Sequence, residues 1–510
     1  MSDEELTSQQ NPVRMWGLIG GVVASVLFLL LFDLDPAHPE ITRTAAVVLL
    51  MAVWWITDAI PLWATALLPV FLFPFFGIMS GKKVSSLYFN EVIFLFLGGF
   101  LVALCMERWN LHKRIALKIL LFFGANPRGI LLGFMTATAF LSMWVSNTAS
   151  TMLMLPIIIA VILKLEESVG VAPIKKYAVG LLLGTAYSAS IGGVATLVGT
   201  PPNPVLVKVF AINFPQAPEI SFASWFAFAL PVSVAFIAFV YFYLAWFFKP
   251  GTEISIDKEE FQREHDELGK TTFEEKVVFA VFTSLAILWL SRADINIGTV
   301  SIPGWANLFP NPSDVNDGTI AIAMATIFFL VPSKALPGER IADWDMVQKL
   351  PWGIILLFGG GFALASGFKD SGLSTWLGNQ LASLHEFNPV TIVATISLMS
   401  TFITELTSNT ATAQILLPIL ASLAVAIKLN PLLIMLPATM SVSFAFMLPV
   451  ATPPNAIVFG AGRIRIIDMA KAGLILNIAG GIIITAAAFI LGPIVFGIDL
   501  GTFPDWAVQK

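Results

Sequence analysis

The chain consists mainly of long apolar runs that are separated by short polar loops. Helices of about 17–25 apolar residues are long enough to span a bilayer, and glycine or proline within them is tolerated where neighbouring protein satisfies the backbone. Polar residues interrupt two of the runs, 177–212 and 431–462. The pattern predicts an all-α polytopic membrane protein with about 11 transmembrane helices. We expect them near residues 15–33, 43–60, 62–79, 89–107, 177–212, 222–248, 275–291, 317–332, 352–368, 431–462 and 471–498.

Two further apolar stretches, 128–165 and 390–427, carry a polar cluster in the middle. Each is about 38 residues long, which is too long for one helix that crosses a bilayer. We therefore expect two re-entrant hairpins, each of which enters and leaves the membrane on the same side.

Composition narrows the class of protein. Of the 510 residues, 57% are hydrophobic and 12% are charged, compared with about 25% charged in a typical soluble domain. The net charge of −5 is spread along the chain, and no block of Lys and Arg indicates a nucleic-acid partner. The single cysteine, Cys105, excludes an internal disulfide. A lipid bilayer is the partner that this composition requires.

The distribution of basic residues indicates an orientation. Cytoplasmic loops of membrane proteins carry an excess of Lys and Arg. With the N-terminus inside and both hairpins re-entrant, twenty of the 28 Lys and Arg fall in the cytoplasm and eight fall outside. An acidic N-terminus precedes the first apolar run, so we expect a retained helix and not a cleaved signal. The chain is expected to be a multi-pass protein of the cell (inner or plasma) membrane, with a cytoplasmic N-terminus and an extracellular or periplasmic C-terminus.

The segment 110–123 has a different pattern from the spanning runs. Leu111, Ile115 and Ile119 share one helical face with Phe122, whereas Lys113 and Arg114 lie off that face. This arrangement predicts a helix that lies along the membrane interface.

Three short motifs occur twice, in the same order. Gly98-Gly99-Phe100 recurs as Gly360-Gly361-Phe362, and Ser146-Asn147-Thr148 recurs as Ser408-Asn409-Thr410, both at an offset of 262 residues. Thr200-Pro201-Pro202-Asn203 recurs as Thr452-Pro453-Pro454-Asn455. The expected spans between the two copies change direction an odd number of times, so the copies are antiparallel. An inverted-topology repeat with interrupted helices is typical of a secondary transporter that binds its substrate near the membrane midplane.

The repeated motifs suit an anion and a small cation. Ser, Asn and Thr are strong N-cap residues, so each hairpin tip is expected to begin a new helix whose free N–H groups favour a carboxylate. Pro201 and Pro453 fit the first position of a helix but cannot continue one, so each break frees carbonyl oxygens. Together with side-chain oxygens, these carbonyls form a neutral cage for an alkali cation. The alternative is that the motifs are only kinks and caps that neighbouring helices satisfy; their duplication in antiparallel halves favours a binding site.

Few ionisable residues occur inside the expected spans, and each is a functional candidate. Glu405 either tunes a cation site or holds the second hairpin tip by hydrogen bonds, and the sequence favours neither reading. Asp58 precedes Ile60-Pro61 and is expected to cap the helix break there. No histidine has a companion at metal-ligand spacing, and no nucleophile, base and acid occur together. The chain is therefore not expected to be an enzyme.

At these motifs the sequence resembles the divalent anion:sodium symporter family, which includes bacterial dicarboxylate transporters and mammalian sodium-coupled di- and tricarboxylate carriers. The resemblance extends to residues 109–117, 139–144, 187–193 and 446–456, and it covers nearly the whole chain apart from the N-terminal dozen residues and the loops. Both hairpins keep Ser-Asn-Thr and both breaks keep Thr-Pro-Pro, as in the bacterial dicarboxylate carriers.

The resemblance implies a homodimer whose protomers combine a scaffold domain with an elevator-type transport domain. The scaffold would comprise 12–123 and 275–385, the transport domain 128–249 and 388–500, and a cytoplasmic linker 250–274. A first Na⁺ site would use Ser142, Ser146, Asn147 and Gly199, and a second would use Thr404, Thr407, Asn409 and Ala451. Substrate carboxylates would contact Asn147, Thr148, Thr200, Pro201, Ser408, Asn409, Thr410, Thr452 and Pro453.

The expected function is symport of C4 dicarboxylates such as succinate, malate or fumarate, with two or more Na⁺ as co-transported ions. The alternatives within the same fold are a Na⁺-independent dicarboxylate exchanger and a tricarboxylate or sulfate symporter. An intramembrane enzyme would need a nucleophile or metal ligands in the spans, and the spans offer only scattered hydroxyls.

Overall fold

The computed structural model describes residues 12–123, 126–251, 259–297 and 300–508. Apart from 3₁₀ turns, the regular structure in this part of the chain is α-helical except for one antiparallel ribbon, in which β1 (Ile295–Ile297) pairs with β2 (Val300–Ile302). Nine stretches of the described residues are long and apolar enough to cross a membrane. The predicted all-α polytopic membrane fold is confirmed. The acidic N-terminal residues and positions 252–258 of the expected linker lie outside the described residues.

The first half of the chain runs from α2 to α13. Its helices are α2 (Pro12–Leu31), α3 (Pro39–Thr57), α4 (Leu62–Thr65), α5 (Leu68–Phe75), α6 (Gly81–Ser86), α7 (Glu91–Arg108), α8 (Leu111–Phe123), α9 (Pro127–Ser142), α10 (Asn147–Val169), α11 (Val171–Val194), α12 (Pro202–Asn213) and α13 (Phe222–Phe247). The expected span 62–79 is divided between α4 and α5, and Pro69 lies in the first turn of α5, where its missing N–H needs no helical partner.

The second half begins after the short helix α14 (Glu259–Glu267). Its helices are α15 (Phe273–Leu290), α16 (Asp317–Leu330), α17 (Trp344–Gln348), α18 (Trp352–Asp370), α19 (Leu373–Leu381), α20 (Pro389–Thr404), α21 (Asn409–Ala426), α22 (Pro431–Ser441), α23 (Pro453–Gly460) and α24 (Ile466–Phe496). Short 3₁₀ turns occur at Trp305–Leu308, Pro312–Asp314, Ala382–Glu386 and Asp505–Ala507.

The two expected hairpins are built alike. The first consists of α9 and α10, joined by residues 143–146, and the second consists of α20 and α21, joined by residues 405–408. Each hairpin begins with an Asn-Pro pair whose asparagine caps the first arm: Asn126 accepts a hydrogen bond from the backbone N–H of Gly129, and Asn388 accepts one from that of Val390.

The repeated glycines allow close packing between helix backbones. A Cβ atom added at Gly98 of α7 would lie 2.5 Å from the backbone carbon of Ala321 in α16. A Cβ atom added at Gly360 of α18 would lie 2.5 Å from the backbone oxygen of Ala66, directly after α4. In both halves the Gly-Gly-Phe motif therefore serves helix contact, as small residues do at membrane helix interfaces.

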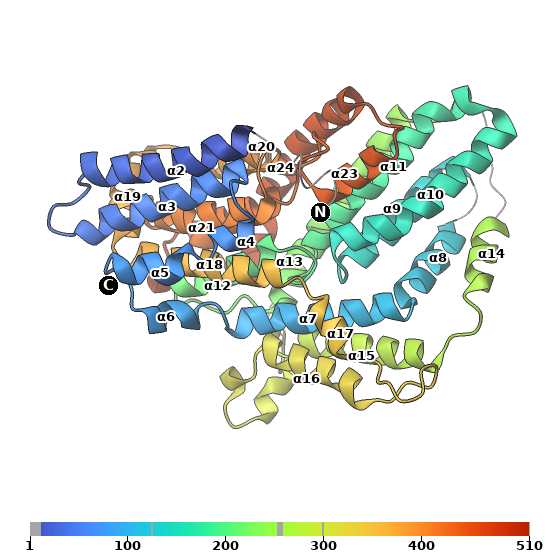
Figure 1. The fold of residues 1–510 in the computed structure, drawn as a ribbon, viewed down its shortest axis with the longest axis horizontal. Coiled ribbons are helices and arrows are strands. Elements are labelled where there is room, and N and C mark those ends of the chain that lie inside the picture. Colours follow the sequence, from blue (N-terminus) through green and yellow to red (C-terminus); the bar gives the residue numbers. More distant parts are fainter. Residues whose placement is uncertain (1–11, 124–125, 252–258, 298–299, 509–510) are drawn as a thin grey trace.

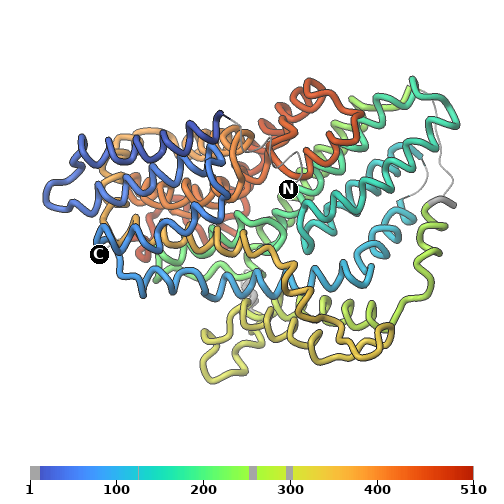
Figure 2. The backbone as a smooth tube through the Cα atoms, in the orientation of Figure 1, coloured from blue at the N-terminus to red at the C-terminus, as the bar shows by residue number. Residues whose placement is uncertain are grey.

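The two hairpins approach the middle of the molecule from opposite sides. In Figure 1, α9 and α10 occupy the right half, whereas α18, α19 and α21 occupy the left half. The α2–α3 pair lies at the outer edge of the left half, which Figure 2 traces in dark blue. The tips of both hairpins line one central cavity. This arrangement matches the antiparallel repeat expected from the sequence.

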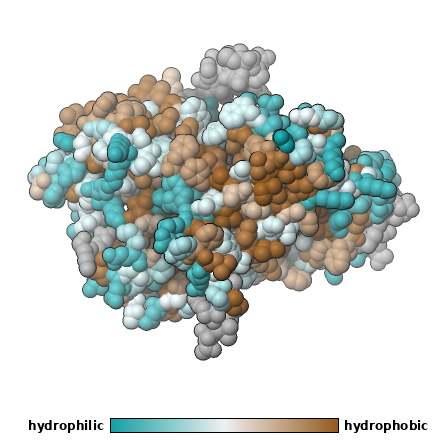
Figure 3. Space-filling view, turned by 90° about the horizontal axis from the view of Figure 1, so that it is seen from below, coloured by the Kyte–Doolittle hydropathy of each residue, from teal (hydrophilic) through white to brown (hydrophobic). Residues whose placement is uncertain are grey.

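Large apolar side chains remain exposed on the surface. Phe75, Phe242 and Trp246 have 78%, 69% and 75% of their surface exposed. Figure 3 shows a wide apolar area on the face seen from below, bordered by hydrophilic side chains. Such surfaces are rare on soluble monomers and fit contact with lipid.

The helix expected at 110–123 is α8, and one of its charged residues is buried. Arg114 is 4% exposed. Its guanidinium pairs with Glu275 of α15 at 3.0 Å and donates to the carbonyls of Leu268 and Gly269. This contact ties α8 to the segment that joins the two halves.

Candidate functional site

All nine residues expected to contact substrate carboxylates line one cavity of about 530 Å³. The cavity lies where the two hairpin tips meet the two Thr-Pro-Pro breaks. The structure therefore brings together four segments that are separated by up to about 300 positions in the sequence. The residues concerned are Asn147, Thr148, Thr200, Pro201, Ser408, Asn409, Thr410, Thr452 and Pro453.

The first hairpin tip contains a cluster of oxygen atoms. Ser142, the last residue of α9, donates a hydrogen bond to the carbonyl of Ala189 at 2.7 Å and contacts the amide of Asn147 at 2.6 Å. Turned over, this amide donates to the Ser142 hydroxyl at 2.6 Å, to Ala189 O at 3.2 Å and to Gly199 O at 3.3 Å. In the other orientation the oxygen of the Asn147 amide faces the Ser142 hydroxyl and the carbonyl oxygens of Ala189 and Gly199. Four oxygen atoms then lie together, and no hydrogen bond joins the amide to either carbonyl. A small cation at that point would relieve their mutual repulsion.

The second hairpin tip repeats this geometry. Thr404, the last residue of α20, donates to the carbonyl of Val442 at 2.9 Å and to Asn409 Oδ1 at 2.6 Å. Both pairs, Ser142 with Asn147 and Thr404 with Asn409, are related by the offset of 262 residues. The same hydroxyl–amide contact therefore supports both tips.

The expected Na⁺ ligands fall into two groups. Ser146, Asn147, Gly199, Thr407, Asn409 and Ala451 line the cavity itself. Ser142 and Thr404 are fully buried and lie directly behind the two asparagines. Both expected sets therefore lie at the wall of the same cavity or directly behind it, and their role as cation ligands stays a prediction.

The asparagines of the two Pro-Pro-Asn sequences hold the unwound segments before them. Asn203 donates to the carbonyls of Thr196 at 2.7 Å, Val194 at 3.2 Å and Gly193 at 3.4 Å. Asn455 donates to the carbonyls of Ala445 and Leu448, both at 3.0 Å. Both asparagines are fully buried. They fix the carbonyl direction in the segments that approach the cavity.

The far wall of the cavity is mostly apolar and comes from the part of the chain expected to be the scaffold. It is formed by Trp55, Ile56, Leu62, Phe96, Phe100, Ile354 and Leu357. Sequence reasoning missed these residues as site residues. Phe100 carried a signal, because it belongs to the repeated Gly-Gly-Phe motif, but the others resemble ordinary apolar residues of spanning helices.

Charge is sparse in the cavity wall. Of the described residues that line it, Asp58 is the one ionisable side chain. Asp58 ends α3 in a left-handed conformation with a φ of 48°, at the break where a cap was expected. Its carboxylate forms an ion pair with Arg14 of α2. An anion in the cavity would therefore meet N–H, hydroxyl and amide groups.

Glu405 lies behind the second tip and is 3% exposed. Its carboxylate accepts hydrogen bonds from the backbone N–H groups of Phe446, Met447 and Leu448 and from the amide of Asn477, at 2.7–3.1 Å. Of the two readings that the sequence left open, holding the tip by hydrogen bonds is the one that these contacts support directly.

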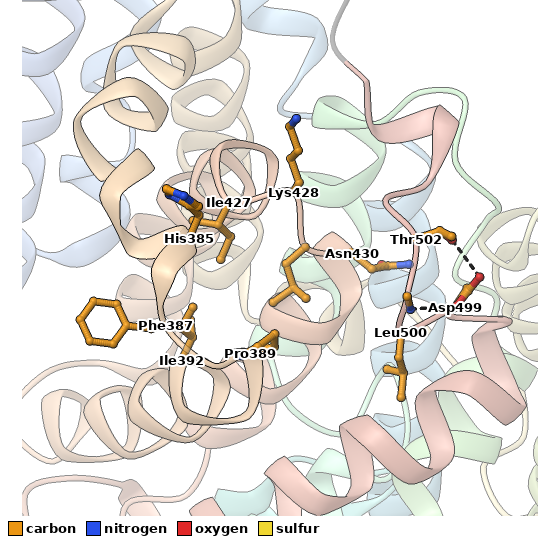
Figure 4. A pocket seen from close by; sticks show the side chains of 12 residues that line it. His385, Phe387, Pro389, Ile392, Ile427, Lys428, Asn430, Asp499, Leu500 and Thr502 are labelled. Atoms are coloured by element: carbon orange, nitrogen blue, oxygen red, sulfur yellow. Dashed lines mark hydrogen bonds between the residues drawn. The ribbon is translucent and has the colours of Figure 1, made fainter.

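A smaller pocket of about 160 Å³ lies apart from the motifs (Figure 4). It is formed by the turn before α20, the α21–α22 connection and residues 499–502. Asp499 accepts hydrogen bonds from the N–H of Gly501 and the hydroxyl of Thr502, and Lys428 extends away from it. None of the expected site residues lines this pocket.

Comparison with known proteins gives consistent results. The family model for the sodium:sulfate symporter transmembrane region matches residues 13–498. The sodium-dependent dicarboxylate transporter SdcS of Staphylococcus saprophyticus is 43% identical, covering 98% of this chain and 95% of that protein. SdcS of Staphylococcus aureus (strain bovine RF122 / ET3-1) is 44% identical, covering 96% of this chain and 93% of that protein.

Two solved structures share the fold at low sequence identity. MtrF of Neisseria gonorrhoeae, described with a class of antimetabolite efflux pumps, has a TM-score of 0.59 at 14% identity, covering 92% of this chain and 98% of that one. The YdaH transporter of Alcanivorax borkumensis has a TM-score of 0.57 at 13% identity, covering 88% of this chain and 98% of that one.

Proposed function

The chain belongs to the family of sodium:sulfate symporters, and from that premise we propose that it is a Na⁺-coupled symporter of C4 dicarboxylates such as succinate, malate and fumarate. The single observation that carries the proposal is the central cavity, in which two antiparallel Ser-Asn-Thr tips face two Thr-Pro-Pro breaks. The names of the SdcS relatives support sodium dependence and dicarboxylate transport.

The chemistry of the cavity suits a small dicarboxylate. The helices α10, α21 and α23 begin at the cavity, and the free N–H groups of a helix N-terminus attract anions. One carboxylate would bind at the Asn147–Thr148 tip and Thr200, and the other at the Asn409–Thr410 tip and Thr452. No covalent step is needed, since transport requires only binding and release on two sides.

The cations would bind behind the carboxylates, one at each tip. The first Na⁺ would be held by Ser142, Ser146, Asn147 and Gly199. The second would be held by Thr404, Thr407, Asn409 and Ala451. Each Na⁺ would neutralise part of the substrate charge that enters the membrane, where an isolated charge is costly. Binding of the anion and the cations would therefore be mutually favourable, which is the physical basis of coupling.

We further propose an elevator movement of 128–249 and 388–500 against a scaffold of 12–123 and 275–385. The helix α12 packs against α7 and α18 of that scaffold. Lys208 of α12 pairs with Glu91 of α7 at 2.7 Å, and Lys369 of α18 donates to the carbonyl of Ile212 at 2.6 Å. An elevator movement would require these polar contacts to be released.

Transport by purified protein in liposomes tests the proposal. Labelled succinate should accumulate under an inward Na⁺ gradient and not when choline replaces Na⁺. Equal uptake in both media would refute Na⁺ coupling. Uptake that requires internal dicarboxylate would indicate an exchanger, and stronger competition by citrate or sulfate than by malate and fumarate would indicate another substrate class.

Two substitutions test the site. Asn147→Ala and Asn409→Ala should each abolish succinate uptake while the protein keeps its size-exclusion profile. Asn388→Ala is the matched control, because it removes an asparagine that caps α20 away from the cavity. Loss of uptake in all three variants would mean that these asparagines are structural.

The homodimer is also a proposal. Native mass spectrometry of the purified protein should give twice the chain mass of 55.2 kDa. A species of one chain mass with full uptake activity would contradict it.

A further inference from the structure

We infer that Glu405 is a positioning residue for the second cation site and that its negative charge favours Na⁺ there. The inference rests on the proposed function. It goes beyond that function because Glu405 does not line the cavity and is none of the proposed ligands. Its effect would be transmitted by the segment between α22 and α23.

That segment is held from two sides. On the N–H side, Glu405 Oε1 accepts from Phe446 at 2.7 Å and from Met447 at 2.9 Å, and Oε2 accepts from Met447 and Leu448, both at 3.1 Å. On the carbonyl side, Asn455 donates to Ala445 and Leu448.

The reason for this support is a difference between the two repeats. At the offset of 252 residues that relates the Thr-Pro-Pro motifs, Val194 corresponds to Phe446. The first-half helix α11 extends to Val194, but its counterpart α22 already ends at Ser441. The N–H groups of Phe446, Met447 and Leu448 lie beyond α22 and have no helical partner, whereas Val194, the counterpart of Phe446, lies within α11. Unpaired N–H groups inside a membrane are strongly destabilising, and a carboxylate can accept hydrogen bonds from all three.

The carboxylate acts as an acceptor in each of these contacts. Its two oxygens accept five N–H contacts in all, three on Oε1 and two on Oε2. All the donors are neutral backbone or amide groups. Across the described residues, no cationic side chain forms an ion pair with Glu405. A buried charge is normally paired or bound to a metal ion, and the proposed Na⁺ is the cation that could compensate it.

The placement of Glu405 links it to that Na⁺. Glu405 directly follows Thr404, which contacts Asn409, and the held segment leads to Ala451 at the cavity. At the equivalent position of the first hairpin the chain has Met143, which carries no charge. The charge should therefore favour Na⁺ at the second tip and not at the first.

The test measures Na⁺ binding without substrate. Thermal unfolding of the purified protein is followed as Na⁺ replaces choline, and the Na⁺ concentration for half-maximal stabilisation is determined. Glu405→Gln keeps the shape of the side chain and removes the charge, so it should raise that concentration about tenfold or more. The KM for succinate at saturating Na⁺ should change less, because the substrate contacts remain.

Two further variants separate charge from structure. Asn477→Leu removes one neutral donor and leaves the carboxylate in place, so its half-maximal Na⁺ concentration should stay within about threefold of the wild-type value. Thr485→Val removes a hydroxyl that bonds to Gly481 and Ser397 between the same helices, α20 and α24; it is the matched control and should leave Na⁺ binding unchanged.

The outcomes are distinguishable. If the wild-type protein shows no stabilisation by Na⁺, the proposed function fails. If Na⁺ stabilises the wild type and Glu405→Gln equally at the same concentrations, the inference is refuted and Glu405 is only structural. If Glu405→Gln is not recovered folded, Glu405→Asp decides instead. It keeps the charge but shortens the reach to 446–448, so an unchanged half-maximal Na⁺ concentration would overturn the positioning role.

Discussion

Replacing Gly193 by alanine should impair the first cation site without removing any ligand. A Cβ atom at this position would lie 2.3 Å from Asn147 Oδ1 and 3.0 Å from the carbonyl oxygen of Gly199. Gly193 lies near the end of α11 and is fully buried, so its backbone has little room to retreat. The Asn147 amide must give way.

The size of the effect follows from the displacement. Real Cβ atoms essentially never approach another heavy atom closer than 3.0 Å, so the amide oxygen must move by about 0.7 Å. Binding sites need their groups within about 0.5 Å of the productive geometry, and a misplacement near 1 Å can cost about 100-fold. We expect the Na⁺ concentration for half-maximal succinate uptake to rise roughly 10- to 100-fold.

The assay is the Na⁺ dependence of initial succinate uptake in proteoliposomes. The control is Gly460→Ala, because a Cβ atom there would meet no atom within 4 Å. It should keep the wild-type Na⁺ dependence. A Gly193→Ala protein with the same Na⁺ dependence as the control would refute the assignment of the Asn147 oxygen cluster as a cation site.

Two ion pairs, Lys208–Glu91 and Arg114–Glu275, should differ in how strongly their loss affects the protein. The Lys208 and Glu91 side chains are 15% and 44% exposed. Reversing either charge, with Lys208→Glu or Glu91→Lys, should change the uptake rate measurably, by up to about fivefold, because partly exposed ion pairs contribute up to about 1 kcal/mol. The double reversal should restore the rate, and equal rates in all four proteins would exclude a role of the pair in the movement. Arg114→Met leaves the buried Glu275 carboxylate without its partner and should lower the free energy of unfolding by about 3–5 kcal/mol. Its thermal midpoint should be lower than that of the control Lys113→Met. Equal midpoints would contradict a structural role of the Arg114–Glu275 pair.

The repeat made much of the site predictable. Because Ser146-Asn147-Thr148 and Ser408-Asn409-Thr410 share the offset of the Gly-Gly-Phe motifs, the sequence predicts that the two tips are paired. The helix breaks were equally visible, since proline removes an N–H and fixes the backbone. The structure adds that all four segments reach one cavity, which follows from packing of helices that are distant in sequence.

Other features could not be predicted because they depend on long-range contacts. Arg114 looks like one of several basic residues in an interface helix, and its burial arises from Glu275, which lies 161 positions further along. The apolar cavity wall is similar: Trp55 and Ile354 differ from other apolar residues of the spans only by where their helices pack. The local sequence pattern therefore predicts neither the burial of Arg114 nor which apolar residues line the cavity.

The surroundings of Glu405 could not be predicted from the repeat, because the two halves differ there. The two halves share the hydroxyl–asparagine contact, but α22 ends earlier than its counterpart α11. In the second half the N–H groups of 446–448, beyond the end of α22, are bound by the Glu405 carboxylate. In the first half the backbones of Gly193 and Gly199 are in close contact: a Cβ atom added at Gly199 would lie 2.4 Å from the Gly193 carbonyl oxygen. The second half has Ala451 at the position equivalent to Gly199, so this close contact is specific to the first half. The two proposed cation sites thus have different supports: a tight backbone contact between Gly193 and Gly199 in the first half, and the buried Glu405 carboxylate in the second. Substitutions at the supports should consequently affect Na⁺ binding at one tip only, whereas substitutions at Asn147 or Asn409 should weaken the binding of both substrate and Na⁺.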